Sequence, residues 1–154
     1  AEPTDSDSPA SEYRKHLVSH VQGTGEWILE TRQYCDWFQS ESVGNLWIRG
    51  IPGCGKSVVA ANFTSRLQRL GDGPVLFFFF REIIQTNRSP RSLLQDFCHK
   101  LLDYSPYLQS DLKQHREKFS AVESVPFETL WGSLSNAMRF MKKVYCVVDA
   151  LDEM

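Results

Sequence analysis

A glycine-rich loop between an apolar segment and a helical segment constrains the fold of this chain more than any other feature. The loop has the pattern G-x-x-x-x-G-K-[ST], which is supplied by Gly50, Gly55, Lys56 and Ser57. Residues 46–48 in front of it are apolar and predict a strand, and residues 56–70 behind it have helical periodicity. A strand, this loop and a helix, in that order, are the context that a phosphate-binding loop requires.

The residue types in the loop suit the binding of ATP or GTP together with Mg²⁺. Glycines let the backbone wrap tightly, so that N–H groups converge on phosphate oxygens, and the following helix directs its positive end to the same place. Lys56 can reach the β- and γ-phosphates, and Ser57 can offer its hydroxyl to Mg²⁺. The predicted nucleotide-binding residues of the loop are Gly50, Ile51, Pro52, Gly53, Cys54, Gly55, Lys56, Ser57 and Val58. The alternative is a glycine-rich turn with an incidental lysine.

A second apolar strand ends in a carboxylate. Residues 144–148 are followed by Asp149, and ligands in parallel α/β sheets bind at the carboxyl ends of strands. We therefore expect Asp149 to hold Mg²⁺ through its water shell. Asp152 or Glu153 could position or activate an attacking water, so these two and Lys56 are the candidate catalytic residues. A solvated acidic turn remains the alternative, chiefly for Asp152 and Glu153.

The remaining pattern predicts an α/β fold with a parallel sheet flanked by helices. Residues 75–80 are apolar without interruption, as in a strand that is covered on both faces. Helical stretches alternate with the strands, and they are expected at residues 13–21, 26–40, 56–70, 90–102, 106–119 and 127–141. In the third of these, the residues expected to face inward are Val59, Phe63, Leu67 and Leu70. We divide the chain into a polar tail that is expected to be disordered (1–12), a helical segment (13–45) and a nucleotide-binding core (46–154).

Composition and charge argue against several other classes. The net charge is −2, from 17 basic and 19 acidic residues, so no basic excess points to nucleic acid or to an anionic membrane. The longest apolar run is too short to span a bilayer, and no secretory signal is visible. The cysteines lack metal or disulfide spacing, which favours reduced thiols in a cytoplasmic protein. The start at Ala1 and the stop at Met154 suggest a piece of a longer protein.

Three segments together resemble a known family. They are residues 23–29 (GTGEWIL), residues 46–57 (LWIRGIPGCGKS) and residues 147–153 (VVDALDE), with Trp37 between the first two. They are similar to NACHT-type NTPases of the STAND class, and in particular to the nephrocystin-like N-terminal NTPase module of large fungal signalling proteins. The resemblance covers about residues 23–154.

The resemblance implies a switch in which Mg²⁺-dependent nucleotide hydrolysis controls self-assembly, in proteins that often continue into ankyrin or WD repeats. It implies that residues 50–57 match the Walker A motif, that Asp149 is the Walker B aspartate, and that Asp152 and Glu153 are its trailing acidic pair. It also implies that Thr24, Gly25 and Trp27 lie near the nucleotide base, although Trp27 could instead belong to the core.

The same resemblance implies a topology. The family inserts its next strand between the loop strand and the Walker B strand, so we expect no ladder between residues 46–51 and residues 144–149. With that strand missing from the sheet, this chain is expected to bind nucleotide poorly and barely to hydrolyse it.

Two further classes share such a loop. A small-molecule or nucleotide kinase would need an acceptor site, usually with an arginine-bearing lid, and no such lid is obvious in the sequence. A nucleotide-binding scaffold would gain only stability from its ligand, without turnover.

Overall fold

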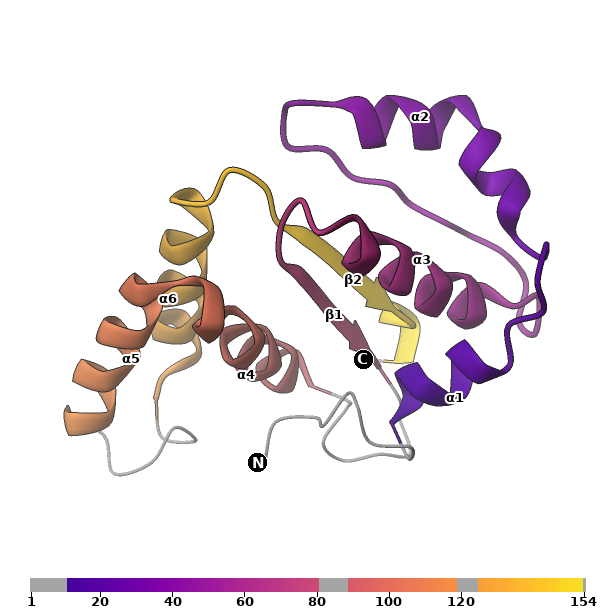
Figure 1. Ribbon diagram of the computed structural model, residues 1–154. Coiled ribbons are helices and arrows are strands. Elements are labelled where there is room, and N and C mark those ends of the chain that lie inside the picture. Colours follow the sequence, from indigo (N-terminus) through magenta and orange to yellow (C-terminus); the bar gives the residue numbers. More distant parts are fainter. Residues whose placement is uncertain (1–10, 81–88, 119–124, 154) are drawn as a thin grey trace.

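The computed structural model describes residues 11–80, 89–118 and 125–153 (Figure 1). This part of the chain is mixed α/β and mostly helical, with one two-stranded parallel sheet. Its α-helices and strands are α1 (Glu12–Val18), α2 (Arg32–Gln39), α3 (Lys56–Leu70), β1 (Val75–Phe79), α4 (Pro90–Leu101), α5 (Pro106–Lys118), α6 (Phe127–Arg139) and β2 (Tyr145–Asp149). Its 3₁₀-helices include η1 (Glu26–Glu30), η3 (Leu102–Tyr104) and η5 (Leu151–Glu153). Most of the predicted tail, residues 1–10, lies outside the described residues.

The sheet is parallel, as the sequence predicts. Val75 pairs with Tyr145 at one end and Phe79 pairs with Asp149 at the other. Between the two strands the chain passes through α4, α5 and α6, which is the long crossover that a parallel pair needs. No helix in the described ranges is both long and apolar enough to cross a membrane.

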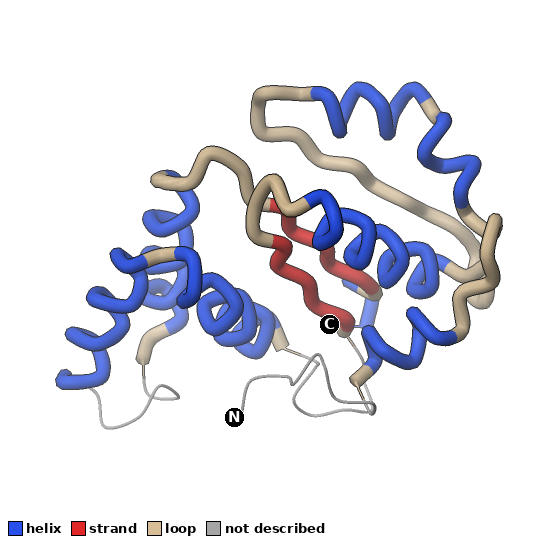
Figure 2. The backbone as a smooth tube through the Cα atoms, viewed as in Figure 1, coloured by secondary structure: helices blue, strands red, loops and turns tan. Residues whose placement is uncertain are grey.

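The side chains of β1 are buried on both faces, as predicted from the apolar run. Leu76 and Phe78 join the larger core, with residues of α4, α5 and α6. Phe77 and Phe79 face the other way and pack with Tyr13 of α1 and with α3. Figure 2 shows the helices on either side of the two strands. The sheet is therefore covered by α1 and α3 on one face and by α4, backed by α5 and α6, on the other.

The single helix predicted for residues 26–40 is wrong. The structure has η1 and then α2, separated by Thr31, whose backbone is extended. The Thr31 hydroxyl accepts a hydrogen bond from the Tyr34 N–H at 3.3 Å. This is an N-cap, which satisfies a free donor at the start of α2 and favours a new helix over the continuation of η1.

The predicted inner face of α3 is also partly wrong. The buried residues are Ala61, Thr64 and Leu67, whereas Leu70 is 54% exposed. Small side chains at positions 61 and 64 let the helix approach the sheet closely. Phe63 turns instead toward α2, where its ring lies 5.6 Å from the ring of Tyr34.

The strand predicted at residues 46–48 does not form. The chain from residue 43 to the glycine loop is irregular backbone that leads from α2 to α3 (Figure 2, tan). Trp47 is 64% exposed. A strand needs a neighbour for its ladder, and within the described residues β1 and β2 pair only with each other. The absence of a ladder between residues 46–51 and β2 agrees with the expectation, although the first segment is not a strand.

Candidate functional site

The glycine loop, residues 50–57, makes a tight turn into α3. Gly53 and Gly55 have φ angles of 78° and 89°, a left-handed conformation that glycine adopts without steric cost. The Cys54 N–H donates to the Ile51 carbonyl at 3.3 Å and closes the turn. Glycine therefore stands at both positions of the loop where the backbone requires it, although only Gly55 belongs to the motif pattern.

Gly50, the first glycine of the motif, has no room for a side chain. A β-carbon added to Gly50 would lie 2.5 Å from the Sγ of Cys54, a distance at which one of the two must move. The Cys54 side chain is thus folded back over the beginning of the loop. Cys54 is therefore a small residue that fits a tight turn.

The helix that follows presents a free N-terminus. Gly55 is the N-cap of α3 and has no side chain with which to cap it. The first N–H groups of a helix have no partner within the helix, and the helix dipole adds partial positive charge there. The backbone N–H groups of Ser57 and Val58 belong to this first turn. The loop and the helix start thus combine the two features that bind anions.

Lys56 folds back across the loop. Its Nζ donates to the carbonyl oxygens of Gly50 at 3.0 Å and of Ile51 at 3.2 Å. Both acceptors are neutral. A phosphate oxygen is a stronger, charged acceptor for an ammonium group, so an anion in the loop would compete well for this side chain.

The segment before the loop approaches the same helix turn. A β-carbon added to Gly25 would lie 2.9 Å from Cγ2 of Val59, which places Gly25 against the first turns of α3, whereas its neighbour Thr24 is exposed. Trp27 is 67% exposed, whereas Ile28 is buried. The alternative that Trp27 is a core residue is therefore wrong.

Asp149 ends β2 and is nearly buried, at 9% exposure. The next residue, Ala150, has a φ of 55°, so the chain turns sharply into η5. Left-handed backbone is strained for alanine, and such strain often accompanies functional sites. The sequence analysis did not single out Ala150, because alanine as a residue type does not indicate a left-handed backbone conformation.

The carboxyl end of β2 points toward the same end of the molecule as the N-terminus of α3 (Figure 1), and α3 packs against β2. Asp149, the last residue of β2, therefore lies at the end of the fold where α3 begins. That its carboxylate faces the glycine loop stays a prediction. Asp152 is exposed in η5, and the side chain of Glu153 lies outside the described part. Among the described residues, no three His, Cys, Asp or Glu side chains gather as a metal site.

Comparison with known proteins supports the resemblance drawn from the motifs. The family model described as nephrocystin 3, N-terminal, matches residues 23–154. The chain is 24% identical, over 136 residues, to the vegetative incompatibility protein HET-E-1 of Podospora anserina. That alignment covers 82% of this chain and 10% of the relative, so the chain spans about a tenth of the length of the curated relative that it matches. No solved structure matches the chain.

Proposed function

The chain belongs to the nephrocystin 3 N-terminal family, and on this premise we propose that it binds a nucleoside triphosphate with Mg²⁺ as the switch of a signalling protein. The observation that carries the proposal is the uncapped start of α3 behind Gly53 and Gly55, with Lys56 lying across it. Converging N–H groups, a helix dipole and an ammonium group favour a polyphosphate over a neutral ligand.

The phosphates would lie in the glycine loop, residues 50–57. The N–H groups of the first turn of α3 would donate to their oxygens, and Lys56 would exchange its two carbonyl acceptors for the β- and γ-phosphates. Gly50 has no room for a side chain beside Cys54. The loop therefore keeps its backbone exposed to the ligand.

Ser57 and Asp149 would hold the Mg²⁺. A hydroxyl and a carboxylate are the hard oxygen ligands that this ion prefers, and Mg²⁺ keeps several waters, so two side chains suffice. When bound there, the ion offsets the negative charge on the phosphate oxygens. The base would lie against the segment of Thr24, Gly25 and Trp27, where an exposed indole face is available to stack on a purine.

We place this chemistry in a P-loop NTPase fold. The parallel pairing of β1 and β2 and the position of α3 support that assignment. In it, residues 46–48 would become a strand when a neighbour pairs with them.

Turnover and assembly extend the proposal to the whole protein. Asp152 and Glu153 would position an attacking water, and the nucleotide state would control self-association of a longer protein that carries ankyrin or WD repeats. The name of HET-E-1 concerns vegetative incompatibility, which suits a signalling switch of this kind.

Metal-dependent binding tests the proposed site. We expect ATP to bind more tightly with Mg²⁺ than with a chelator, and we expect Asp149→Asn to remove most of that difference while leaving metal-free binding intact. Asp103→Asn, in the distant η3, serves as the matched control. Equal affinity with and without Mg²⁺ in the unaltered chain would reject the assignment of Ser57 and Asp149.

A second experiment separates a switch from a scaffold without turnover. In the full-length protein, replacement of Asp152 and Glu153 by Asn and Gln should slow phosphate release without weakening ATP binding. An unchanged rate of release would mean that these two residues do not position the water.

A further inference from the structure

A pocket of about 540 Å³ lies between α2 and the second half of α3. This volume is within the range of small-molecule sites. The residues that line it include Tyr34, Trp37, Phe38, Phe63, Arg66 and Arg69. Because a helix rises about 1.5 Å per residue, Phe63 lies roughly 10 Å along α3 from Lys56, and Arg69 roughly 20 Å. The pocket is therefore separate from the glycine loop.

Aromatic rings form the walls of the pocket, and Tyr34 is at their centre. Its ring is stacked with that of Phe38, with the centroids 5.6 Å apart and the planes 9° from parallel. It also lies 5.6 Å from the ring of Phe63 and 5.9 Å from that of Trp37. All four side chains are only half-buried, so parts of their surfaces remain available to a ligand. Aromatic rings stack favourably on other flat π-systems.

Two arginines give the pocket its charge. Arg66 and Arg69 are exposed on α3, and no carboxylate of the described residues forms an ion pair with either. Burial raises the pKa of the Tyr34 hydroxyl, while the positive charge of Arg66 opposes that rise. Arg66 and Tyr34 line the same pocket.

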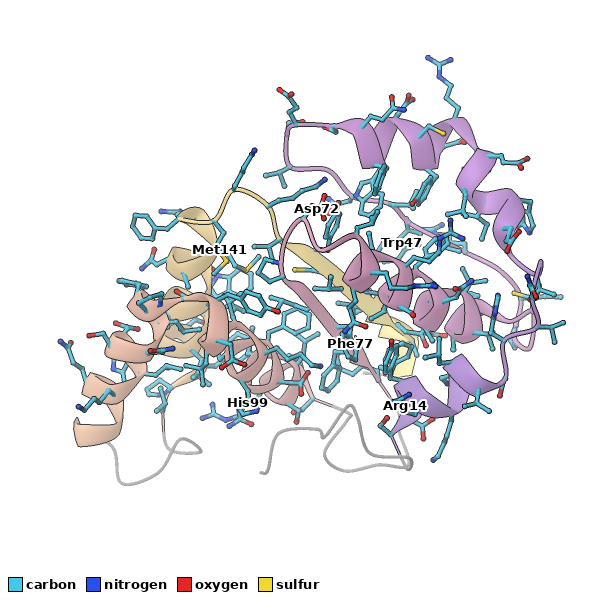
Figure 3. The ribbon with its side chains drawn as sticks, in the orientation of Figure 1. Arg14, Trp47, Asp72, Phe77, His99 and Met141 are labelled. Carbon is cyan, nitrogen blue, oxygen red and sulfur yellow. The ribbon has the colours of Figure 1, made fainter. Side chains whose placement is uncertain are left out.

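The charge of the neighbouring Lys143 is already balanced by a carboxylate. Lys143 lies 5.3 Å above the ring of Phe38, but its Nζ donates to the carboxylate of Asp72 at 3.0 Å. Figure 3 shows Asp72 at the turn after α3. The Tyr145 hydroxyl donates to the same carboxylate at 3.1 Å. The unbalanced positive charge at the pocket therefore comes from Arg66 and Arg69.

We propose that this pocket binds a small, flat aromatic ligand with a negative charge. The ring of the ligand would lie among the rings of Tyr34, Trp37 and Phe63, and its anionic group would pair with Arg66 and Arg69. Guanidinium groups suit this role, because they bind carboxylate-like groups through two parallel hydrogen bonds and also stack on aromatic faces. A neutral apolar ligand would form no ion pair with Arg66 or Arg69.

The test uses the full chain and two dyes that share their aromatic rings but differ in charge. Anilinonaphthalene sulfonate is the anionic probe, and phenylnaphthylamine is its neutral counterpart. We expect the sulfonate to bind saturably, with one site per chain, and at least about tenfold more tightly than the neutral dye, since hydrogen bonds to charged groups are the stronger ones. Equal affinities would reduce the pocket to an apolar patch and overturn the proposal.

Variants locate the site. The double variant Arg66→Gln, Arg69→Gln should weaken binding of the sulfonate about tenfold or more and leave the affinity for the neutral dye unchanged. Arg32→Gln, which removes a 91% exposed guanidinium from the same region, is the matched control. Because ATP is itself an aromatic anion, Lys56→Ala is tested as well, and it should leave dye binding unchanged. Binding that follows Lys56 and not the two arginines would contradict the proposal. Circular dichroism of each variant establishes that it is folded.

Discussion

Gly25 lies against Val59, so closely that a β-carbon on Gly25 would be 2.9 Å from Val59 Cγ2. This contact joins the segment before the loop to the helix that the loop opens. We predict that Gly25→Ala destabilises the chain by about 2 kcal/mol or more, since a left-handed alanine alone costs about 1–2 kcal/mol and the clash adds to it. Urea unfolding measures the change.

Gly23→Ala is the matched control for that variant. Gly23 also has a positive φ, 85°, but a β-carbon there would meet nothing within 4 Å. It should therefore show the backbone cost alone. Equal losses of stability in Gly25→Ala and Gly23→Ala would contradict the close contact between Gly25 and Val59.

Nucleotide should protect Cys54 from alkylation. Cys54 is exposed in the glycine loop, so phosphates bound there would cover it. Cys98 is the internal reference, because it is buried and burial raises its pKa to about 12, which keeps it a thiol. We predict that iodoacetamide modifies Cys54 much faster than Cys98, and that ATP with Mg²⁺ slows only the reaction of Cys54, as measured by mass spectrometry. Unchanged labelling of Cys54 at saturating nucleotide would argue against binding in the loop.

Trp27 should contribute to affinity and not to stability. It is 67% exposed, so Trp27→Ala removes little buried surface. We predict an ATP affinity that falls several-fold, in line with about 1 kcal/mol for an aromatic contact, with an unfolding midpoint that is unchanged. Trp131→Ala, at a 54% exposed indole on α6, should affect neither property. A Trp27 variant that unfolds would show that the residue has a structural role.

The buried pair of Lys100 and Asp96 on α4 should respond asymmetrically to substitution. Lys100 Nζ pairs with Asp96, donates to the Phe77 carbonyl at 2.6 Å and lies 3.8 Å above the Phe77 ring. Removing one partner leaves a buried charge, so Lys100→Met should cost about 3–5 kcal/mol. The double variant Lys100→Met, Asp96→Asn should recover most of the stability that Lys100→Met loses.

An exposed pair provides the comparison. Lys143→Met removes the ammonium that pairs with Asp72, whose side chain is 41% exposed, and it should cost less than about 1 kcal/mol. Equal losses for the two lysines in chemical unfolding would contradict the importance of burial here.

The sequence predicts best those features that depend on short-range pattern. The apolar run of β1 indicated a strand buried on both faces, and the glycines of the loop indicated a backbone that wraps tightly. Both signals are local, because a residue type alone decides whether it avoids water or tolerates a positive φ. The parallel pairing of β1 and β2 followed from the alternation of strands with helices.

The remaining features depend on partners far away in the chain. The strand predicted at residues 46–48 needs a neighbour that no local pattern can supply. The break at Thr31 was hidden because helical periodicity continues through it, while a single hydroxyl cap ends one helix and starts another. The aromatic pocket exists because Phe63 turns toward α2, which only the packing of two helices decides.

Calorimetric titration of ATP with Mg²⁺ into the chain decides whether the glycine loop binds nucleotide. Lys56→Ala is the variant, and Lys142→Ala, at an exposed lysine before β2, is its control. A charge-assisted hydrogen bond contributes about 1.5–3 kcal/mol. Its loss in Lys56→Ala should therefore weaken ATP binding by at least about tenfold. The Lys142 variant should bind like the unaltered chain. Equal, weak binding of ATP at millimolar concentration by the unaltered chain and by Lys56→Ala would contradict a nucleotide site in the glycine loop.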